Sequence, residues 1–364
     1  MSNTKKFEVL LELAGEITRE KEPENLIPLL ADMVKNLLNV DRCSLFLYDE
    51  NRDVLFTVVA HGKVKIEVAP NRGIVGASFR DGVPLIVQEA YADPRFNKEV
   101  DKQTGYVTKN ILSIPLFNTK KKVIGVFEAI NKIDGDFTDE DLKLFQLLSI
   151  YAANTIEAST LYKKIEDAYK ETIYRLAFAA EYKDPETYNH IVRIGFMAST
   201  LGQKINLEKA LCNKLQLAAP MHDIGKIGIP DRVLLKKGRL EGEEIEIMRK
   251  HTIIGYEILK DSESELLQMA SRIALEHHEK WDGTGYPYGK RGDEISVEAR
   301  IVSIIDVFDA LTSNRPYKTA WSITDAVKYM EELSGKDFDP YILSVFLENL
   351  QEFIKIKSKY KDEI

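Results

Sequence analysis

MHDIGKIGIPD (residues 221–231) and HHEKWDGTGYP (residues 277–287) decide how the second half of this chain folds and what it can do. Each contains a histidine next to another potential metal ligand. Five of the chain's six histidines fall in this half: His190, His222, His251, His277 and His278. Imidazole nitrogens and carboxylates bind catalytic metals, and a carboxylate such as Asp223 can bridge two cations. Because the chain has only two cysteines, the pattern predicts a hydrolytic centre with several metal ions held by nitrogen and oxygen.

The spacing of several polar residues supports this interpretation. Glu186 and His190 are four residues apart, so on a helix they share one face. His222 and Lys226 have the same spacing, which would place a cation beside whatever His222 holds. A single helical histidine is more often a surface or hydrogen-bonded core residue than a ligand. The prediction therefore rests on the joint arrangement.

The remaining candidates lie on other helical segments. His251 follows the charged residues of MRK, and we expect it at the exposed start of a helical turn. The two adjacent histidines close the helical stretch 271–278. Asp306 lies in the apolar stretch 299–311, where a carboxylate without a partner would be costly to bury. Metal coordination would remove that cost.

Length and composition limit the classes of protein. At 364 residues the chain suits two domains of roughly 150 to 200 residues. Its net charge of −8 argues against non-specific binding of duplex nucleic acid as its main role. The sequence has no run of 18 apolar residues and no apolar signal-peptide core. We therefore expect a cytoplasmic protein that does not enter a membrane.

The first 160 residues predict an α+β domain with one antiparallel sheet and flanking helices. Two helical patterns come first, at 7–19 and 24–38. Strand-like segments follow at 42–49, 54–62, 63–69, 83–88, 110–117 and 122–132. From Thr138 the pattern is helical past residue 180, and after Tyr182 the chain is predominantly helical.

The connecting helix, residues 140–180, carries apolar and small residues every seven positions. One series runs through Leu144, Tyr151, Ala158, Ile165 and Thr172, and the other through Leu148, Thr155, Tyr162, Tyr169 and Leu176. Such a repeat predicts a parallel two-helix seam and hence a homodimer. The alternative is an amphipathic helix that packs only on its own domain.

The ordered motifs resemble a known family. Residues 172–364 resemble the HD-GYP subgroup of the HD phosphohydrolases. The resemblance rests on the motifs HDIGK, His251, HHEKWDGTGYP and IIDVFDALTSNRPYK. This resemblance implies an all-α fold. The N-terminal half is similar to a GAF domain through NILSIPL and GVFEAINKIDGDFTDEDLKLF.

The resemblance implies a phosphodiesterase that converts cyclic di-GMP to 5′-pGpG, with a second cut to GMP left open. It assigns a catalytic role to Lys226, which would stabilise charge on the phosphate, and to Asp223, which would bridge two ions. It also implies iron, in a trinuclear centre because an acidic residue stands at position 186, with manganese as the alternative metal. The implied metal ligands are Glu186, His190, His222, Asp223, His251, His277, His278 and Asp306.

Substrate contacts are also implied by the resemblance. Arg315 and Lys318 would bind the phosphate that is not cut; the alternative is a solvated turn. Gly285 and Tyr286 lie in the loop 282–287, whose glycines allow close approach of a nucleotide. In this family the loop is also associated with diguanylate cyclase domains as partners.

The residues of the GAF-like domain are compatible with more than one ligand. Asn131, Lys132, Phe137 and Asp141 fit the pattern of cyclic-nucleotide-binding GAF domains, but Leu142 stands where that pattern has Glu. A different small ligand, or a purely dimerising role, is at least as compatible with these residues.

Three alternatives to a cyclic di-GMP phosphodiesterase remain open. The chain can be an HD phosphohydrolase for another cyclic dinucleotide, or a non-catalytic metal- and nucleotide-binding signalling module. Iron could also make it a redox or gas sensor, which need not exclude catalysis. In each case we expect the signal to pass from the GAF-like domain through the connecting helix.

Overall fold

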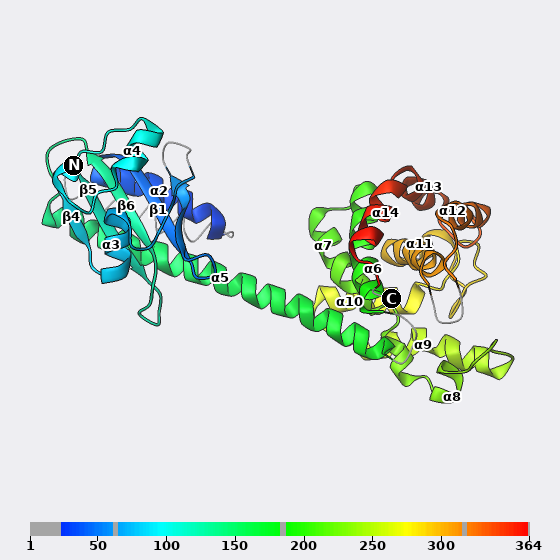
Figure 1. Cartoon of the computed structure of the whole chain (residues 1–364). Helices are drawn as coiled ribbons and strands as arrows, with labels where there is room; N and C mark the ends of the chain where they lie inside the picture. The colour runs from blue at the N-terminus through cyan, green and yellow to red at the C-terminus, as the bar shows by residue number, and fades with distance from the viewer. Residues whose placement is uncertain (1–22, 61–64, 183–186, 315–318, 363–364) are drawn as a thin grey trace. The chain divides into compact units, whose positions relative to one another are not determined.

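A computed structural model describes residues 23–60, 65–182, 187–314 and 319–362 (Figure 1). The chain divides into two compact units, Met1–Ile165 and Glu166–Ile364. Each unit has its own hydrophobic core. The expected helix at 7–19 lies outside the described residues.

The first unit contains a six-stranded sheet in the order β3-β2-β1-β6-β5-β4. All of its neighbouring strands pair antiparallel, which confirms the predicted single antiparallel sheet. β3 covers only two residues, whereas the sequence suggested a strand over 63–69. The strands are β1 (Val40–Asp49), β2 (Val54–Ala60), β3 (Glu67–Val68), β4 (Leu85–Val87), β5 (Ile111–Phe117) and β6 (Val123–Lys132).

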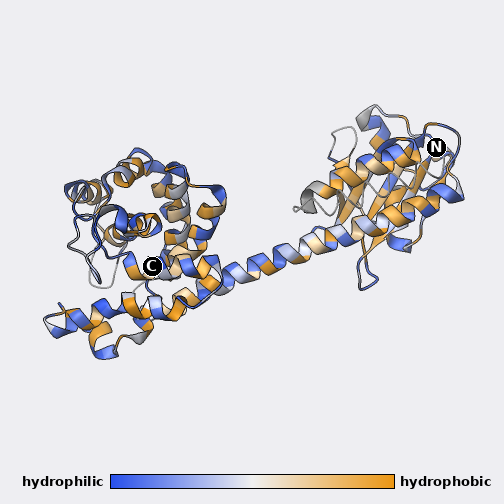
Figure 2. Cartoon of the chain, turned by 180° about the vertical axis from the view of Figure 1, so that it is seen from behind, coloured by the Kyte–Doolittle hydropathy of each residue, from blue (hydrophilic) through white to orange (hydrophobic). Residues whose placement is uncertain are grey.

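Alternating side chains give the sheet two different faces, and its strands are largely apolar (Figure 2). One face packs on α2 (Pro23–Leu38) and on the first part of α5 (Asp139–Glu181), where Phe127 meets Phe145 edge-on at 5.0 Å. α3 (Gly73–Asp81) covers the other face, and α4 (Lys98–Thr104) follows β4. The sequence patterns did not predict α3 or α4.

The long helix α5 has 43 residues, as its sequence pattern predicted. Leu148 is fully buried in the core of the first unit, and Leu144 packs against that core. These two positions therefore serve their own domain rather than a seam between two chains. From Tyr151 onward the seven-residue series is mostly exposed, with Tyr162 69% and Ile165 68% accessible.

The second unit is helical, which confirms the expected all-α fold. Its helices pack around a core that includes Met197, Ile273, Ile305 and Phe308. The longer helices are α6 (Tyr188–Lys204), α7 (Lys209–Ala218), α9 (Glu243–Leu259), α10 (Glu265–Glu276), α11 (Val297–Thr312), α12 (Ile323–Glu332), α13 (Pro340–Glu348) and α14 (Leu350–Lys359). Between α7 and α9 the chain forms short helical turns at Ala219–Met221 and Ile224–Gly228 and the one-turn helix α8 (Asp231–Leu234). Among the described residues, no helix combines the length and apolar character that crossing a bilayer requires.

Candidate metal centre

The metal-ligand candidates of the second unit converge from five segments. His190 lies on α6, and His222 and Asp223 lie in the short turns between α7 and α8. His251 lies on α9, His277 and His278 directly follow α10, and Asp306 lies on α11. His251 is buried in the middle of α9, so its expected position at the exposed start of a helix is wrong. The charged residues before it form the solvent side of that same helix.

A glycine allows the HDIGK turn to reach α9. A Cβ at Gly225 would lie 1.9 Å from the carbonyl oxygen of His251 and 2.4 Å from the amide nitrogen of Gly255. Real Cβ atoms do not approach backbone so closely, so only glycine fits. This contact places Asp223 directly against the histidines of α9 and α10.

The two carboxylate oxygens of Asp223 face different neighbours. Oδ1 lies 3.2 Å from Nε2 of His251 and 3.6 Å from Nε2 of His277. Oδ2 lies 3.3 Å from Nε2 of His222 and 2.7 Å from Nζ of Lys226. A carboxylate with donors on both sides has the arrangement needed to bridge two cations.

Two adjacent donor sets result. In each set the ligand atoms lie within 4.8 Å of one another. The first consists of Asp223, His251, His277 and His278, and the second of His190, His222 and Asp306. In the second set, Oδ1 of Asp306 lies 3.8 Å from Nε2 of His190 and 3.8 Å from Nε2 of His222.

Four of the histidines have their other ring nitrogen occupied. Nδ1 of His222, His251 and His277 contacts the carbonyl oxygens of Ala219 (3.1 Å), Met248 (2.7 Å) and Ile273 (3.0 Å). Nδ1 of His190 contacts Asp309 at 2.8 Å. Because an acceptor at Nδ1 holds a proton there, Nε2 is the ring nitrogen that faces the centre and can bind a cation in the neutral form of each ring.

Buried polar atoms without a hydrogen-bond partner, and the pKa shifts of two histidines, are also consistent with a metal site. Nε2 of His222 and Oδ1 of Asp223 are buried without a hydrogen-bond partner among the described residues. Burial lowers the pKa of His277 and lowers that of His278 well below its usual value, so both are neutral donors at neutral pH. The donor set of imidazole and carboxylate therefore suits divalent transition metals.

The charges around Asp223 hold it ionised. Burial alone would raise its pKa, but Lys226 and His222 outweigh burial and hold the pKa well below the usual range. Burial likewise opposes the charged form of His222, yet Asp223 and Asp306 raise the pKa of His222 to about 10. A cation that binds at Nε2 must displace this proton, so binding at His222 competes with protonation.

Family models match both units. A GAF-domain model matches residues 22–156, and an HD-domain model matches residues 176–342. The chain joins a GAF domain to an HD domain. The boundary between the two matches falls within α5.

Curated relatives match a little more than half of the chain. A cyclic di-GMP phosphodiesterase of Thermotoga maritima is 42% identical over 57% of this chain and 56% of its own length. A cyclic di-GMP phosphodiesterase response regulator of Xanthomonas campestris is 41% identical, over 54% of this chain and 52% of its own. A 3′3′-cGAMP-specific phosphodiesterase of Vibrio cholerae is 37% identical, over 62% and 44%. The chain thus spans about half the length of the curated relatives it matches.

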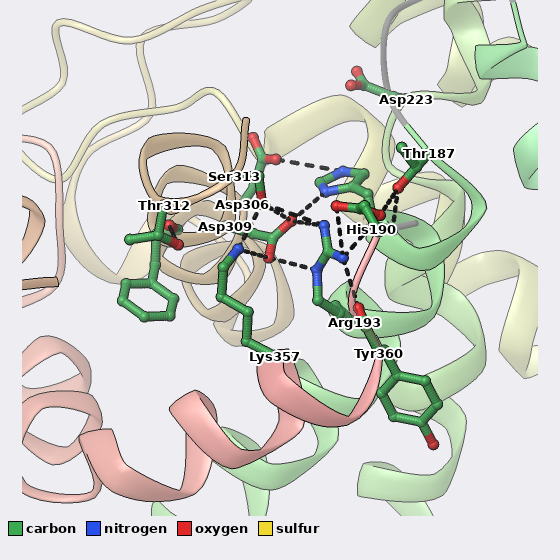
Figure 3. Close-up of polar contacts among 12 residues, drawn as sticks. Thr187, His190, Arg193, Asp223, Asp306, Asp309, Thr312, Ser313, Lys357 and Tyr360 are labelled. Carbon is green, nitrogen blue, oxygen red and sulfur yellow. Dashed lines mark hydrogen bonds and ion pairs between the residues drawn. The ribbon is translucent and has the colours of Figure 1, made fainter. Parts of the chain in front are cut away.

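Behind the candidate metal ligands of the HD domain lies a buried charge network (Figure 3). Asp309 receives hydrogen bonds from Nε and Nη2 of Arg193, at 2.7 and 2.8 Å, and from Nζ of Lys357 at 3.0 Å. Burial would raise the pKa of Asp309, but its bonds to His190 and Arg193 outweigh it and lower the pKa far below the usual range. Asp309 therefore stays charged and fixes the orientation of the His190 ring.

The same network ties down the C-terminal segment. Arg193 also donates to the carbonyl oxygen of Tyr360 at 2.8 Å and to the carboxylate of Asp362 at 3.1 Å. Thr187, the N-cap of α6, bonds to Asp362 as well. The residues after α14 thus help to hold the first turn of the helix that carries His190.

Glu181 is a buried acid that sequence analysis missed. It ends α5, is 1% exposed, and neither carboxylate oxygen has a hydrogen-bond partner among the described residues. Its carboxylate groups with His222 and Asp223 in a third possible donor set, and burial raises its pKa to about 7. A carboxylate that closes the apolar run AFAAE was the available signal. The expected third-metal ligand, Glu186, lies outside the described residues.

The loop 282–287, called the GYP loop below, packs against His278 just after α10. The ring of Tyr286 stacks on His278 at 4.8 Å, and the guanidinium of Arg249 lies 5.0 Å from the Tyr286 ring centre. A Cβ on Gly285 would lie 2.3 Å from the amide nitrogen of Lys280, so this glycine is needed for the fold of the loop. The expected substrate contacts Arg315 and Lys318 lie outside the described residues.

Proposed function

We propose that this chain is a metal-dependent phosphodiesterase that hydrolyses cyclic di-GMP to 5′-pGpG. One observation carries the proposal: Asp223 stands between His222, His251 and His277, and each of these histidines presents Nε2 toward it. The proposal does not decide whether the chain also hydrolyses 5′-pGpG to GMP. Such a substrate would place the reaction in the cytoplasm.

Each residue has a role that its contacts support. The histidines and Asp306 would hold the cations, and Asp223 would bridge them. Bound cations would lower the pKa of water and neutralise the phosphate charge. Lys226, whose ammonium already lies 2.7 Å from Asp223, would stabilise charge on the phosphate oxygens during cleavage. Asp309 would keep the His190 ring in position through its bond to Nδ1.

For the metal we propose iron in a trinuclear centre, with manganese as the alternative. The imidazole and carboxylate donors accept both. Glu186 would serve the third ion, and Glu181 is the described acid nearest to that role because it groups with His222 and Asp223. Metal analysis of Glu181→Gln and Glu186→Gln separates the two: loss of about one third of the bound metal in only one variant identifies the ligand.

The substrate side would use cations and the GYP loop. Arg315 and Lys318 would bind the second phosphate. Tyr286, which covers His278, and Gly285 would line the approach to the metals. The same loop would contact a diguanylate cyclase domain. A cyclic GMP–AMP substrate is the second candidate, because a relative at 37% identity is named for that dinucleotide.

The test is an anaerobic incubation of the iron- or manganese-loaded chain with cyclic di-GMP and, separately, 3′3′-cGAMP. Products are separated by ion-pair chromatography. We expect 5′-pGpG from cyclic di-GMP, lost in His222→Ala and kept in Glu89→Gln, whose carboxylate is exposed in the GAF domain. Turnover of 3′3′-cGAMP alone would support the second candidate. No turnover at full metal occupancy would favour a non-catalytic signalling module, and loss of turnover in air, restored by reductant, would add redox sensing.

A further inference from the structure

The GAF domain contains a pocket far along the chain from the metal ligands. It lies on the sheet face that α3 covers and has a volume of about 740 Å³, including its open mouth. Phe46, Ile66, Val75 and Ile130 supply apolar walls.

A buried acid lines this pocket. Glu128 on β6 is 6% exposed and pairs in register with Ser44 of β1 and Ser113 of β5. The three side chains form a polar row across the apolar sheet. Oγ of Ser113 has no hydrogen-bond partner among the described residues, and no hydrogen bond or ion pair to the Glu128 carboxylate is found there. Leaving an acid in such surroundings costs free energy unless something occupies the pocket.

The other charged groups of the pocket do not compensate Glu128. Asp101 is another acid, and it is held by the backbone N–H and hydroxyl of Thr108, at 2.7 and 2.8 Å. Arg42 lies over the Tyr106 ring at 3.7 Å, and Arg72 lines the pocket before α3. Burial, and then the charge of Asp101, raise the pKa of Glu128 to about 8. None of the described groups lowers this pKa, so a bound cation would be the charge that stabilises the ionised form of Glu128.

Asp141 shows how the same domain accommodates an acid that has its own polar partners. It is also buried, but it pairs with Lys132 and accepts hydrogen bonds from the backbone and hydroxyl of Thr138. Its pKa is lowered, because these bonds outweigh burial. Glu128 lacks such partners and faces a pocket, which is typical of a ligand-binding group.

We propose that the GAF pocket binds a small organic cation, a protonated amine on a compact apolar or aromatic body, with its N–H groups donating to Glu128. The apolar walls would hold the body of the ligand, and the buried carboxylate would select its charge. Because Glu128 is mostly protonated at pH 7, binding of the cation would release a proton to solvent.

The experiment is calorimetric titration of the full chain with tyramine, benzylamine and agmatine at pH 7. N-acetyltyramine, which keeps the ring of tyramine but has no charge, is the matched ligand control. Heats are measured in two buffers of different ionisation enthalpy to count released protons. We expect saturable binding of at least one amine below about 1 mM, most of one proton released, and no binding of N-acetyltyramine.

Variants locate the site. Glu128→Gln should weaken amine binding about tenfold or more, because a charge-assisted hydrogen bond is lost, and Glu89→Gln should not change it. Val68→Phe, which narrows the pocket without changing Glu128, should also weaken binding. The proposal fails if none of the three amines binds the folded chain, if Glu128→Gln binds as tightly as the parent, or if N-acetyltyramine binds equally well.

Discussion

Nδ1 of His190 lies 2.8 Å from Oδ2 of Asp309, while Nε2 of the same ring lies 3.8 Å from Asp306. The imidazole thus connects a buried charge network to the metal-ligand cluster. The carboxylate of Asp309 in turn accepts hydrogen bonds from the side chains of Arg193 and Lys357, so its charge is compensated within the HD domain. The orientation of His190 therefore depends on residues outside the candidate ligand set.

Asp309→Asn should lower the metal affinity of the second donor set by roughly 10- to 100-fold, the usual effect of losing a partner behind a histidine ligand. The reason is that a neutral amide has one acceptor oxygen instead of two, so it accepts the Nδ1 proton more weakly and leaves Arg193 less well compensated. Competition with a chelator measures the affinity, and circular dichroism checks the fold. Asp261→Asn, at an exposed acid of the same unit, should bind metal as the parent does. Equal affinity in both variants would show that Asp309 only supports stability.

Gly225→Ala should destabilise the HD domain and release metal, because its Cβ would overlap the His251 carbonyl oxygen. We expect a loss of about 3 kcal/mol or more in the free energy of unfolding, the upper end for overpacking. Gly228→Ala is the matched control, since its Cβ would meet only the side chain of Ile254, at 3.0 Å. Denaturant titration with metal analysis compares them. A milder effect at Gly225 than at Gly228 would contradict this account.

Local chemistry made part of this site predictable. Some metal-ligand candidates could be chosen from the sequence because an imidazole or a carboxylate stands within an apolar helical pattern. These candidates are the His222–Asp223 pair, the two histidines after α10, and Asp306. The burial of His251 could not be predicted from the sequence. The preceding residues MRK are typical of a solvent-exposed segment, but the helix buries the side chain that follows them. Glu181 closes the apolar run AFAAE, but this run does not show that Glu181 groups with His222 and Asp223, which lie about 40 residues later in the sequence.

The fold shows the same limit. The strands of the GAF domain were visible as alternating segments, and α5 as a long periodic stretch. Helix α3 contains two glycines, which weaken its helical pattern. One of them, Gly76, is required because a Cβ there would lie 2.8 Å from the Pro70 carbonyl oxygen. Tertiary packing rather than propensity therefore determines that helix.

Lys226→Gln should reduce kcat by about 100- to 1,000-fold, the usual effect of losing one group that stabilises charge in the transition state. Metal content should fall little, because Lys226 contacts Asp223 without being a ligand. Steady-state kinetics and metal analysis are made on the same preparation. Lys237→Gln, at an exposed lysine of the following loop, should keep parental activity. An unchanged kcat in Lys226→Gln would remove this residue from the catalytic set.

Glu128 should make the GAF domain less stable as the pH rises. Its folded pKa of about 8 lies above the ordinary value of 4.5, so the folded state binds the proton more tightly than the unfolded chain. The stability that this proton provides is fully present below pH 4.5 and is lost as pH rises toward 8. At pH 7 the loss is roughly 3 kcal/mol.

Glu128→Gln should therefore stabilise the GAF domain relative to the parent, with a gain that grows from pH 5 to pH 8. Calorimetric melting of the full chain across this range measures the gain. Glu89→Gln should leave the pH dependence as it is, because that carboxylate is exposed. If Glu128→Gln destabilises the domain at every pH, then Glu128 has partners that compensate its charge.

The exposed part of α5 should join two copies of the chain. Tyr151, Ala158, Ile165 and Thr172 alternate with Thr155, Tyr162, Tyr169 and Leu176, at the four- and three-residue spacing of a coiled-coil seam. Large apolar side chains in this series are exposed in the single chain, and burying them against the same residues of a second copy would remove them from water. We therefore propose a parallel homodimer whose seam begins after Leu148.

Ile165→Asp should dissociate this dimer, because a carboxylate at the centre of the seam would be buried opposite its own copy. Sedimentation velocity at several concentrations should show dimer for the parent and monomer for the variant. Thr160→Asp places the same carboxylate on the exposed surface of the helix outside the seam series, and it should stay dimeric. Monomer for the parent, or dimer for both variants, would mean that α5 does not form the seam. The exposed apolar residues of α5 would then need another occupant.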